Sequence, residues 1–246
     1  MLELHNIYLE KNKVKVLSDI NLTVNEGETV VLTGPSGCGK STLIRVALGL
    51  IKPQKGEVWF EGVNLQALSE KMLRKKRRKM GIVFQEFQLL EHFTLLENVL
   101  LALWEGEHDF SKAEKAIKSV GLWEKRFRYP RQLSGGEKQR VGIARALALD
   151  PDIIFWDEPT AALDPMYVHE ILRIMDSLAQ KKTMLVVTHE MPFALKVADR
   201  LVLMESGKIV EEAPPQKIFV QPSSYLGVMY RERLLDTKDA LSKLAQ

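Results

Sequence analysis

A glycine-rich segment between an apolar run and a helical pattern constrains this chain more than any other feature. Residues 34–42 read GPSGCGKST; they follow the apolar residues 29–32 and precede the apolar residues 43–48. Strand, glycine-rich turn and helix is the context in which G-x-x-x-x-G-K-[ST] forms a phosphate-binding loop. Glycines let successive backbone N–H groups curl around phosphate oxygens, and the following helix turns its positive end toward them. We therefore expect this segment to bind a nucleoside triphosphate.

Two side chains of the loop are expected to act on the ligand directly. Lys40 would reach the β- and γ-phosphates, and the hydroxyl of Ser41 would ligate a magnesium ion. ATP and Mg²⁺ are the cofactors expected. The loop residues expected to contact the triphosphate are Gly34, Pro35, Ser36, Gly37, Cys38, Gly39, Lys40, Ser41 and Thr42.

Composition limits the class of protein. With 246 residues the chain is long enough for one large domain with an inserted subdomain. A formal net charge of +3 is too small to argue for nucleic acid by itself, and the single cysteine, Cys38, excludes an intramolecular disulfide. The N-terminus lacks a signal-peptide pattern, and no apolar run reaches about 18 residues, so we expect no membrane-spanning segment.

Alternating apolar and polar positions predict a small antiparallel sheet early in the chain. Its strands are expected at residues 2–9, 17–24 and 58–60. Because a nucleotide base often stacks on an aromatic ring in such a region, Tyr8 is a candidate for that contact. Packing of Tyr8 within its own strand is the alternative, and the sequence leaves both open.

A basic helix and a short strand come next. Residues 66–79 have a polar helical pattern that ends in RKKRRK at residues 74–79. Such a run can contact nucleic acid or anionic lipid, but without interleaved aromatic residues it is more typical of a solvated face. Residues 81–84 then predict a buried strand ending at Gln85. The amide of Gln85 could ligate magnesium and the attacking water, although by itself it is an ordinary loop residue.

Helical periodicity without a strand signal predicts a helical insertion over residues 87–150. Near its end, Ser134 and Glu137 form a capping box, so a helix should run from there to about residue 149. Gly135 and Gly136 occupy the first turn, where each glycine costs roughly 1 kcal/mol against alanine. Capping alone does not explain these glycines, whereas a helix N-terminus whose backbone lies against a phosphate does.

Two carboxylates follow a strand of the expected core sheet. Residues 153–156 read IIFW, which is typical of a parallel strand buried on both faces, and Asp157 and Glu158 come directly after it. Ligands of open α/β sheets bind beyond the carboxyl ends of strands, so both side chains should face the phosphates. Adjacent strand residues point to opposite sides, so their roles should differ. Asp157 would hold magnesium through its water, and Glu158 would be the general base.

The last predicted strands complete the sheet. Residues 183–188 form a buried strand with His189 at its end, where a ring N–H can hold the γ-phosphate. Residues 201–204 and 208–210 predict a hairpin. From Tyr225 onward the chain has helical periodicity, and the pattern identifies no function for this tail.

Taken together, these motifs resemble the ATP-binding cassette family over nearly the whole chain. The phosphate loop, the glutamine after residues 83–84, LSGGE at residues 133–137, DEPTAALDP at residues 157–165 and the histidine of VVTHE occur in the family's order. Residues 81–100 and 186–212 look most like importers for polar amino acids.

The resemblance implies an α/β fold: a P-loop NTPase core with a mixed, mostly parallel sheet, an N-terminal antiparallel β subdomain and an inserted α-helical subdomain. Within a single domain of residues 1–246, the core and β subdomain are expected at residues 1–86 and 151–220. The helical subdomain is expected at residues 87–150, and a C-terminal helical tail at residues 221–246.

The resemblance also implies a mechanism that one chain cannot complete. In this family two cassettes dimerise head to tail with two ATP molecules between them. Ser134, Gly135, Gly136 and Glu137 would then contact the ATP held by a second ATPase subunit, in a homodimer. Asp164 would help to link the two sites.

Further partners follow from the same resemblance. Gln85 and the helical insertion would face transmembrane permease subunits, and a substrate-binding protein would act indirectly. The chain would lie on the cytoplasmic face of the plasma or inner membrane, and no nucleic acid is expected. Val16 fits the family's hydrophobic neighbour of the base, whereas the base-stacking aromatic of the family aligns near Lys11.

Three functions have to be distinguished. The first is an ATPase subunit that energises import of a polar amino acid or a similar small solute. The second is a cassette ATPase acting on nucleic acid or ribosomes, a class that often carries paired cassettes or long insertions, unlike this chain. The third is a GTPase switch, whose Asn-Lys-x-Asp motif is incomplete at residues 12–15. The sequence favours the first.

Overall fold

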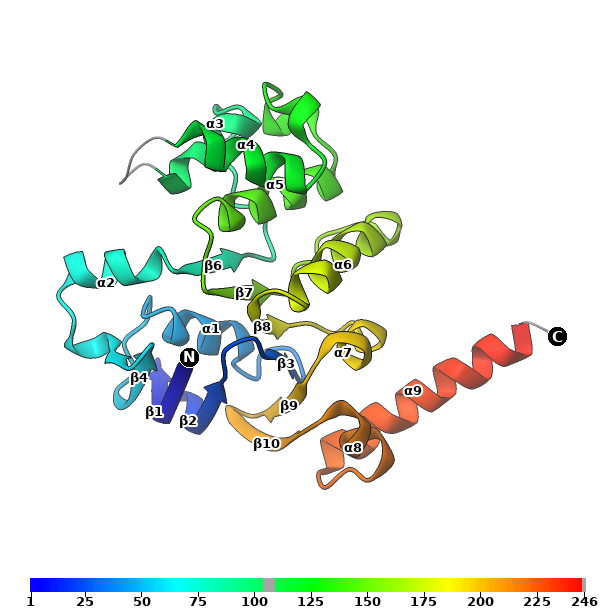
Figure 1. Ribbon diagram of the computed structural model, residues 1–246. Coiled ribbons are helices and arrows are strands. Elements are labelled where there is room, and N and C mark those ends of the chain that lie inside the picture. The colour runs from blue at the N-terminus through cyan, green and yellow to red at the C-terminus, as the bar shows by residue number, and fades with distance from the viewer. Residues whose placement is uncertain (104–108, 245–246) are drawn as a thin grey trace. The chain divides into compact units, whose positions relative to one another are not determined.

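The computed structural model describes residues 1–103 and 109–244 and divides into two compact units. The first unit comprises Met1–Ala67 with Val186–Gln246, and the second comprises Leu68–Leu185. Figure 1 follows the chain from the blue N-terminus to the red C-terminal helix. Within the described ranges, no helix combines the length and the apolar character that crossing a membrane requires.

A four-stranded antiparallel sheet forms the N-terminal part of the first unit. Its two long strands bury alternate apolar side chains, including Leu2 and Leu4 on one and Leu22 and Val24 on the other, as expected when one face packs on a core. In spatial order the strands are β2 (Val14–Val24), β1 (Leu2–Lys11), β4 (Lys55–Phe60) and β5 (Val63–Asn64). The predicted antiparallel sheet is confirmed, and both long strands extend further toward their hairpin than predicted.

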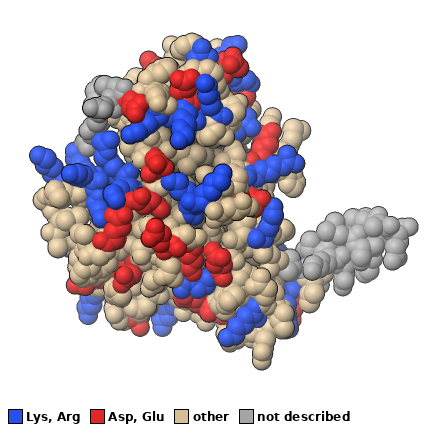
Figure 2. Space-filling view, in the orientation of Figure 1, with Lys and Arg blue, Asp and Glu red and all other residues tan. Residues whose placement is uncertain are grey.

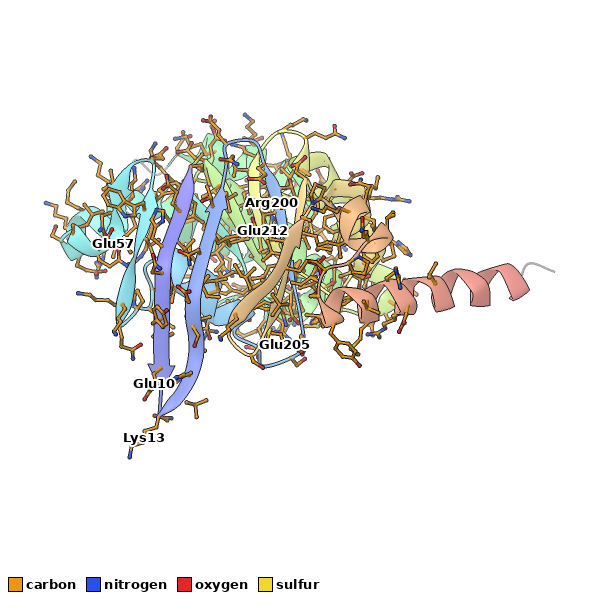
Figure 3. The ribbon with its side chains drawn as sticks, turned by 90° about the horizontal axis from the view of Figure 1, so that it is seen from below. Glu10, Lys13, Glu57, Arg200, Glu205 and Glu212 are labelled. Atoms are coloured by element: carbon orange, nitrogen blue, oxygen red, sulfur yellow. The ribbon has the colours of Figure 1, made fainter. Side chains whose placement is uncertain are left out.

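A tight turn joins β1 to β2. Asn12 and Lys13 have φ angles of 52° and 63°, and a type I′ hairpin turn requires positive φ at both central residues. Lys11 pairs with Val14 across this turn. Figure 3 labels Glu10 and Lys13 at the tip. The position at which the family's base-stacking aromatic aligns is thus occupied by an exposed lysine beside a hairpin tip.

Parallel strands form the core of the first unit. β3 (Thr29–Thr33) is buried at every position and pairs in parallel with β9 (Arg200–Glu205), which pairs antiparallel with β10 (Lys208–Ala213). The last residues of β8 (Thr183–Val187) lie beside β3. The predicted strands and the predicted hairpin are confirmed. The α-helices in the described part of this unit are α1 (Lys40–Ala47), α7 (Met191–Val197), α8 (Pro215–Val220) and α9 (Tyr225–Leu244).

Arg200 at the start of β9 connects three segments of the first unit. Its Nε lies 2.9 Å from Oε1 of Glu28, its Nη1 donates to Oε1 of Glu212 at 2.6 Å, and its Nη2 donates to the carbonyl of Thr23. Figure 3 shows Arg200 of β9 beside Glu212 of β10. These contacts fix the beginning of the strand that carries Met204.

The second unit has its own parallel strands. β6 (Met80–Val83) pairs in parallel with β7 (Ile153–Asp157), and the first residues of β8 lie beside β7. All residues of β7 are buried, as the apolar run of this strand predicts. With the pairings of the first unit, this confirms a mixed sheet in which most pairs are parallel.

Between β6 and β7 the described residues form helices and no strand, as predicted; residues 104–108 lie outside the described part. The helices α3 (Leu95–Leu100), α4 (Phe110–Ser119) and α5 (Gly135–Leu147) pack against one another and are drawn in green shades in Figure 1. The remaining α-helices described in this unit are α2 (Glu70–Arg77) and α6 (Pro165–Ala179).

The predicted basic helix is shorter than its pattern. Leu65–Ala67 form a separate 3₁₀ turn, and Ser69 caps α2. Figure 2 shows Lys and Arg side chains gathered over α2. Glu70 pairs with Arg77 at 3.2 Å, and both ends of this pair are reached by solvent. Such exposed pairs contribute little stability and are typical of the solvated face favoured by the sequence.

A buried glutamate of β10 fixes the start of α9. Glu211 is 7% exposed, and its carboxylate accepts from the N–H groups of Ser223 and Ser224 at 2.7 and 3.0 Å and from the Ser224 hydroxyl at 2.5 Å. A Cβ on Gly227 would lie 2.4 Å from Oε2 of Glu211. Burial alone would raise the pKa of Glu211, but the hydrogen bonds from Ser224 and Ser223 outweigh it and lower the pKa.

We expect Glu211→Gln to lower the free energy of unfolding at pH 7 by about 1–3 kcal/mol, because one amide oxygen cannot replace a carboxylate that holds the start of α9. The pKa of Glu211 is lowered in the folded state, so this stabilisation is present above the ordinary carboxyl pKa and is lost as pH falls through the lowered value. Urea unfolding at a series of decreasing pH values should therefore show a shrinking difference in the free energy of unfolding between wild type and Glu211→Gln.

The matched control is Glu205→Gln, because Glu205 is exposed at the end of β9 (Figure 3). Its free energy of unfolding should stay within about 0.5 kcal/mol of wild type. Equal losses in the two variants at pH 7 would contradict a special role for Glu211.

Candidate functional site

The predicted phosphate loop lies between β3 and α1. Gly34, Gly37 and Gly39 have φ angles of 155°, 79° and 109°, in the range that favours glycine. A Cβ on Gly34 would lie 1.9 Å from the carbonyl oxygen of Met204, so a larger residue does not fit there. The strand, turn and helix context predicted from the sequence is confirmed.

Lys40 is the first residue of α1 and folds back over the loop. Its side chain is buried, and its Nζ donates to the carbonyls of Gly34 and Pro35 at 2.8 and 3.0 Å. The first turn of α1 holds no acidic residue, and its N-cap, Gly39, offers no side-chain hydrogen bond. A cation, a helix N-terminus and an inward-curving backbone together suit a phosphate group.

The far end of the loop is held by the turn between β9 and β10. The N–H of Gly207 donates to the Cys38 carbonyl at 3.0 Å, and the Gly207 carbonyl accepts from the Ser18 N–H at 2.8 Å. A Cβ on Gly207 or on Gly39 would lie within 2.8 Å of the Val16 carbonyl oxygen. Val16 is therefore beside the loop. The contact of Gly207 was missed, because its sequence signal is only that of a turn.

A cavity of about 600 Å³ opens beside the loop. Gly34, Pro35, Ser36 and His189 line it, so the structure brings His189, at the end of β8, next to the loop as predicted. The other lining residues come from α7 and α9 and are Met191, Pro192, Leu226, Met229, Tyr230 and Arg233. Periodicity predicted α9 as a helix, but no local signal placed it beside the loop.

Asp157 and Glu158 lie at the end of β7, as predicted. Asp157 is 5% exposed, whereas Glu158 is half-buried and has a φ of 48°. Positive φ is uncommon outside glycine, but Asp150 and Ser206 have the same φ of 48°, so the value by itself indicates a turn. The N–H of Ala161 donates to the Glu158 carbonyl at 3.1 Å and closes that turn. Glu158 therefore belongs to a turn, whereas Asp157 is the last residue of the strand.

The predicted capping box begins α5. The Ser134 hydroxyl accepts from the Glu137 N–H at 3.3 Å, and the Glu137 carboxylate accepts from the Ser134 N–H at 2.9 Å. Glu137 also pairs with Lys125. Burial would raise the pKa of Glu137, but the hydrogen bonds from Lys125 and Ser134 lower it. The capping box and the helix are confirmed, although α5 ends at Leu147 rather than near residue 149.

The two glycines in the first turn of α5 have different surroundings. A Cβ on Gly136 would lie 2.9 to 3.0 Å from the side chain of Tyr167 on α6, so packing within the chain already requires glycine there. A Cβ on Gly135 would meet Leu163 and Phe87 at 3.6 and 3.8 Å, which is ordinary contact. A phosphate contact is therefore needed to explain Gly135 but not Gly136.

Gln85 is exposed just beyond β6, and α5 holds the segment that contains it. Gln139 Nε2 donates to the Phe84 carbonyl at 3.1 Å, and Arg145 Nη1 donates to the Gln88 carbonyl at 2.5 Å. Burial lowers the pKa of Arg145. Sequence reasoning missed Gln139 and Arg145. The only hint in the sequence is that each is a polar side chain next to apolar residues of a predicted helix.

Asp164, the predicted link between sites, is the N-cap residue of α6. Its side chain is exposed and makes no capping hydrogen bond, while its carbonyl accepts from the Tyr167 N–H at 2.9 Å. Within the described residues, no three or more His, Cys, Asp or Glu side chains form a cluster that could hold a metal ion.

A buried strand, a glycine-rich loop and a helix that begins with lysine define the class of P-loop nucleotide-binding proteins. Comparison with known proteins then identifies the family. The sequence matches the family described as ABC transporter over residues 17–161, more than half of the chain. The chain therefore belongs to the ABC transporter family, as its motifs predicted, and it is an ATPase with an ATP-binding domain.

Several relatives are similar over nearly their full length. The arginine transport ATP-binding protein ArtM of Bacillus subtilis is 43% identical, over 96% of this chain and 100% of the relative. The glutamine transport ATP-binding protein GlnQ of Geobacillus stearothermophilus is 42% identical with the same coverage. The glutamate/aspartate import ATP-binding protein GltL of Escherichia coli K12 is 45% identical, over 91% of this chain and 95% of the relative.

Solved structures agree with the fold. A dimeric structure of the ATP-binding cassette MJ0796 in a post-hydrolysis state, bound to ADP and Pi, matches with a TM-score of 0.79 and 36% identity. The match covers 87% of this chain and 99% of that one. The predicted fold class is confirmed. None of the relatives described above supports the alternative of a cassette acting on nucleic acid or ribosomes.

We expect Gly136→Ala to lower the free energy of unfolding by about 1–3 kcal/mol, because the added methyl group would overlap the Tyr167 side chain. Gly135→Ala is the matched control one residue earlier, where a methyl group meets only ordinary contacts. Its stability should equal or exceed that of wild type, since alanine favours helix. Urea unfolding of both variants tests this, and equal stabilities would contradict the packing argument.

Proposed function

We propose that this chain energises the import of a polar amino acid or a similar small solute, as one of two ATPase subunits on a membrane permease. The observation that carries this proposal is the full-length similarity to ArtM, GlnQ and GltL, whose names specify arginine, glutamine and glutamate/aspartate transport. The chain would act at the cytoplasmic face of the inner membrane as a peripheral subunit. A substrate-binding protein would take part indirectly.

In this proposal the phosphate loop holds the triphosphate of ATP. Backbone N–H groups of residues 34–42 bind the phosphate oxygens, and the ammonium of Lys40 moves from the carbonyls of Gly34 and Pro35 to the β- and γ-phosphates. Val16 would lie near the base, since its carbonyl is beside Gly39.

Three oxygen donors would hold Mg²⁺. They are the Ser41 hydroxyl in the first turn of α1, the buried Asp157 carboxylate and the Gln85 amide oxygen. A hydroxyl, a carboxylate and an amide, completed by phosphate oxygens and water, fit a small hard cation that prefers six oxygen ligands. When bound, the ion neutralises charge on the phosphates and orients them for attack.

Glu158 and His189 would carry the hydrolytic step. The attacking water gives a proton to the Glu158 carboxylate as its oxygen bonds to the γ-phosphorus, and the bond from that phosphorus to ADP breaks. The His189 ring N–H holds a γ-phosphate oxygen as negative charge shifts. The position of Glu158 directly after the buried Asp157 at the end of β7 supports its role.

A second subunit would complete each site. Ser134, Gly135, Gly136 and Glu137 at the tip of α5 would contact the γ-phosphate held by the partner, and Asp164 would help to link the two sites. The dimeric solved structures of similar cassettes support this assembly. No close contact within the chain requires glycine at position 135. A ligand that lies against the backbone of Gly135 would explain why glycine is present there.

Gln139 and Arg145 suggest how the two ends of the second unit communicate. Both side chains lie on α5, whose first turn follows Ser134, and both bind carbonyls of the segment around Gln85. A shift of α5 on ATP closure would therefore pull that segment with it. If Gln85 and the helical insertion face the permease, this is a direct mechanical connection to it.

We expect Glu158→Gln to retain ATP binding and to lower the ATPase rate by about a hundredfold or more, because the amide cannot accept the proton of the attacking water. The variant should accumulate as a dimer with ATP, measured by size-exclusion chromatography. The matched control is Glu26→Gln, an exposed residue in the turn before β3 and outside the proposed site. Undiminished turnover in Glu158→Gln would remove Glu158 from the role of base.

The transport function has its own test. Deleting the gene in its own host should abolish uptake of one radiolabelled polar amino acid at micromolar concentration, and the wild-type gene should restore uptake whereas Lys40→Ala should not. The chain should also purify with a membrane permease after mild detergent extraction. Unchanged uptake of all polar amino acids in the deletion strain would refute import of these solutes while leaving the ATPase assignment intact.

A further inference from the structure

One face of the C-terminal helix α9 meets the phosphate loop. Leu226 and Tyr230 lie four residues apart and therefore share a face of α9. Leu226 is 6% exposed and Tyr230 is half-buried, whereas Tyr225 is 76% exposed. Both Leu226 and Tyr230 line the cavity beside Gly34. The register of α9 thus directs one hydroxyl group toward the loop.

That hydroxyl contacts the residue at which β3 becomes the loop. The Tyr230 hydroxyl lies 3.1 Å from the Thr33 hydroxyl, and Thr33 directly precedes Gly34, the first residue of the loop. Thr33 is fully buried at the end of β3. Burial raises the pKa of Tyr230, so the phenol stays neutral and acts only through hydrogen bonds.

The position of Tyr230 is fixed from the start of the same helix. Glu211 binds Ser223 and Ser224 immediately before α9, and the Ser224 hydroxyl accepts from the Gly227 N–H at 2.9 Å. Because a helix of this kind is rigid over one or two turns, anchoring its start also sets the place of Tyr230.

We propose that Tyr230 is a positioning residue for the phosphate loop, and that α9 thereby sets the affinity of the loop for the triphosphate. This inference rests on the proposed function, since it requires residues 34–42 to bind ATP. Gly34 lies against the Met204 carbonyl, and the Tyr230 hydroxyl holds Thr33, the residue before it. Lys40 in turn binds the Gly34 and Pro35 carbonyls.

Tyr230 would affect how tightly ATP binds and not how fast it is hydrolysed. A loop already held in its binding geometry loses less conformational freedom when ATP binds. This advantage is the same in the ground state and in the transition state, so its loss should raise KM and leave kcat unchanged. A residue with a merely structural role would instead change the melting temperature without changing KM.

The test is a double-mutant cycle between Tyr230 and Thr33 in the full-length protein. Tyr230→Phe removes the hydroxyl, and Thr33→Val replaces its partner with a side chain of equal shape. Each should raise KM and the equilibrium Kd for MgATP about two- to tenfold, the value of one hydrogen bond. The double variant should be no worse than Tyr230→Phe alone, because both changes remove the same contact.

Three controls make the outcome decisive. Thr33→Ser retains a hydroxyl and should keep the wild-type KM, and Tyr225→Phe changes an exposed tyrosine of the same helix and should do the same. Lys40→Ala should abolish ATP binding if the loop is the ATP site. Failure of that variant to weaken binding would overturn the loop assignment itself.

If Lys40→Ala abolishes binding, the remaining results bear on Tyr230 alone. An unchanged KM in Tyr230→Phe, or independent and multiplicative effects of Tyr230→Phe and Thr33→Val, would overturn its positioning role. A lower melting temperature with unchanged KM would do so as well.

Discussion

The first unit depends on how its phosphate loop is enclosed by backbone. A loop that turns its N–H groups inward has no strand or helix partner for them, so its geometry must be imposed from outside. Here Gly34 lies against the Met204 carbonyl and Gly39 against the Val16 carbonyl. The Cys38 carbonyl accepts a hydrogen bond from the Gly207 N–H. The hairpin of β9 and β10 therefore helps to shape the phosphate loop through its backbone.

Local patterns were sufficient to predict the loop, its strand and helix, the capping box at Ser134, and the strand that ends at Asp157. Each is encoded within about ten residues by periodicity, glycine or a capping pair. Local patterns could not predict the roles of Gly207, Gln139 and Tyr230. Each of these residues forms a hydrogen bond with a residue that is far away in the sequence. A single sequence predicts whether a segment is a helix or a strand more readily than it predicts which other segment it packs against.

The glycines at the start of α5 show how a correct motif can have two causes. Because glycine is costly in a helix, the sequence alone predicts a phosphate contact for both. The structure gives Gly136 a different reason, the nearby Tyr167 side chain, and leaves Gly135 without a steric one. Some residues of a motif can thus be required by packing and others by function, and only the structure around each residue distinguishes the two.

The tail shows the reverse case, a segment without a motif that nonetheless lies against the loop. Glu211 fixes the start of α9, and Tyr230 reaches the end of β3 from the same helix. A hydrogen bond of this kind changes an equilibrium by about tenfold at most, far less than the full affinity for a triphosphate. The tail therefore cannot decide whether ATP binds, but it can decide at what concentration the loop is filled.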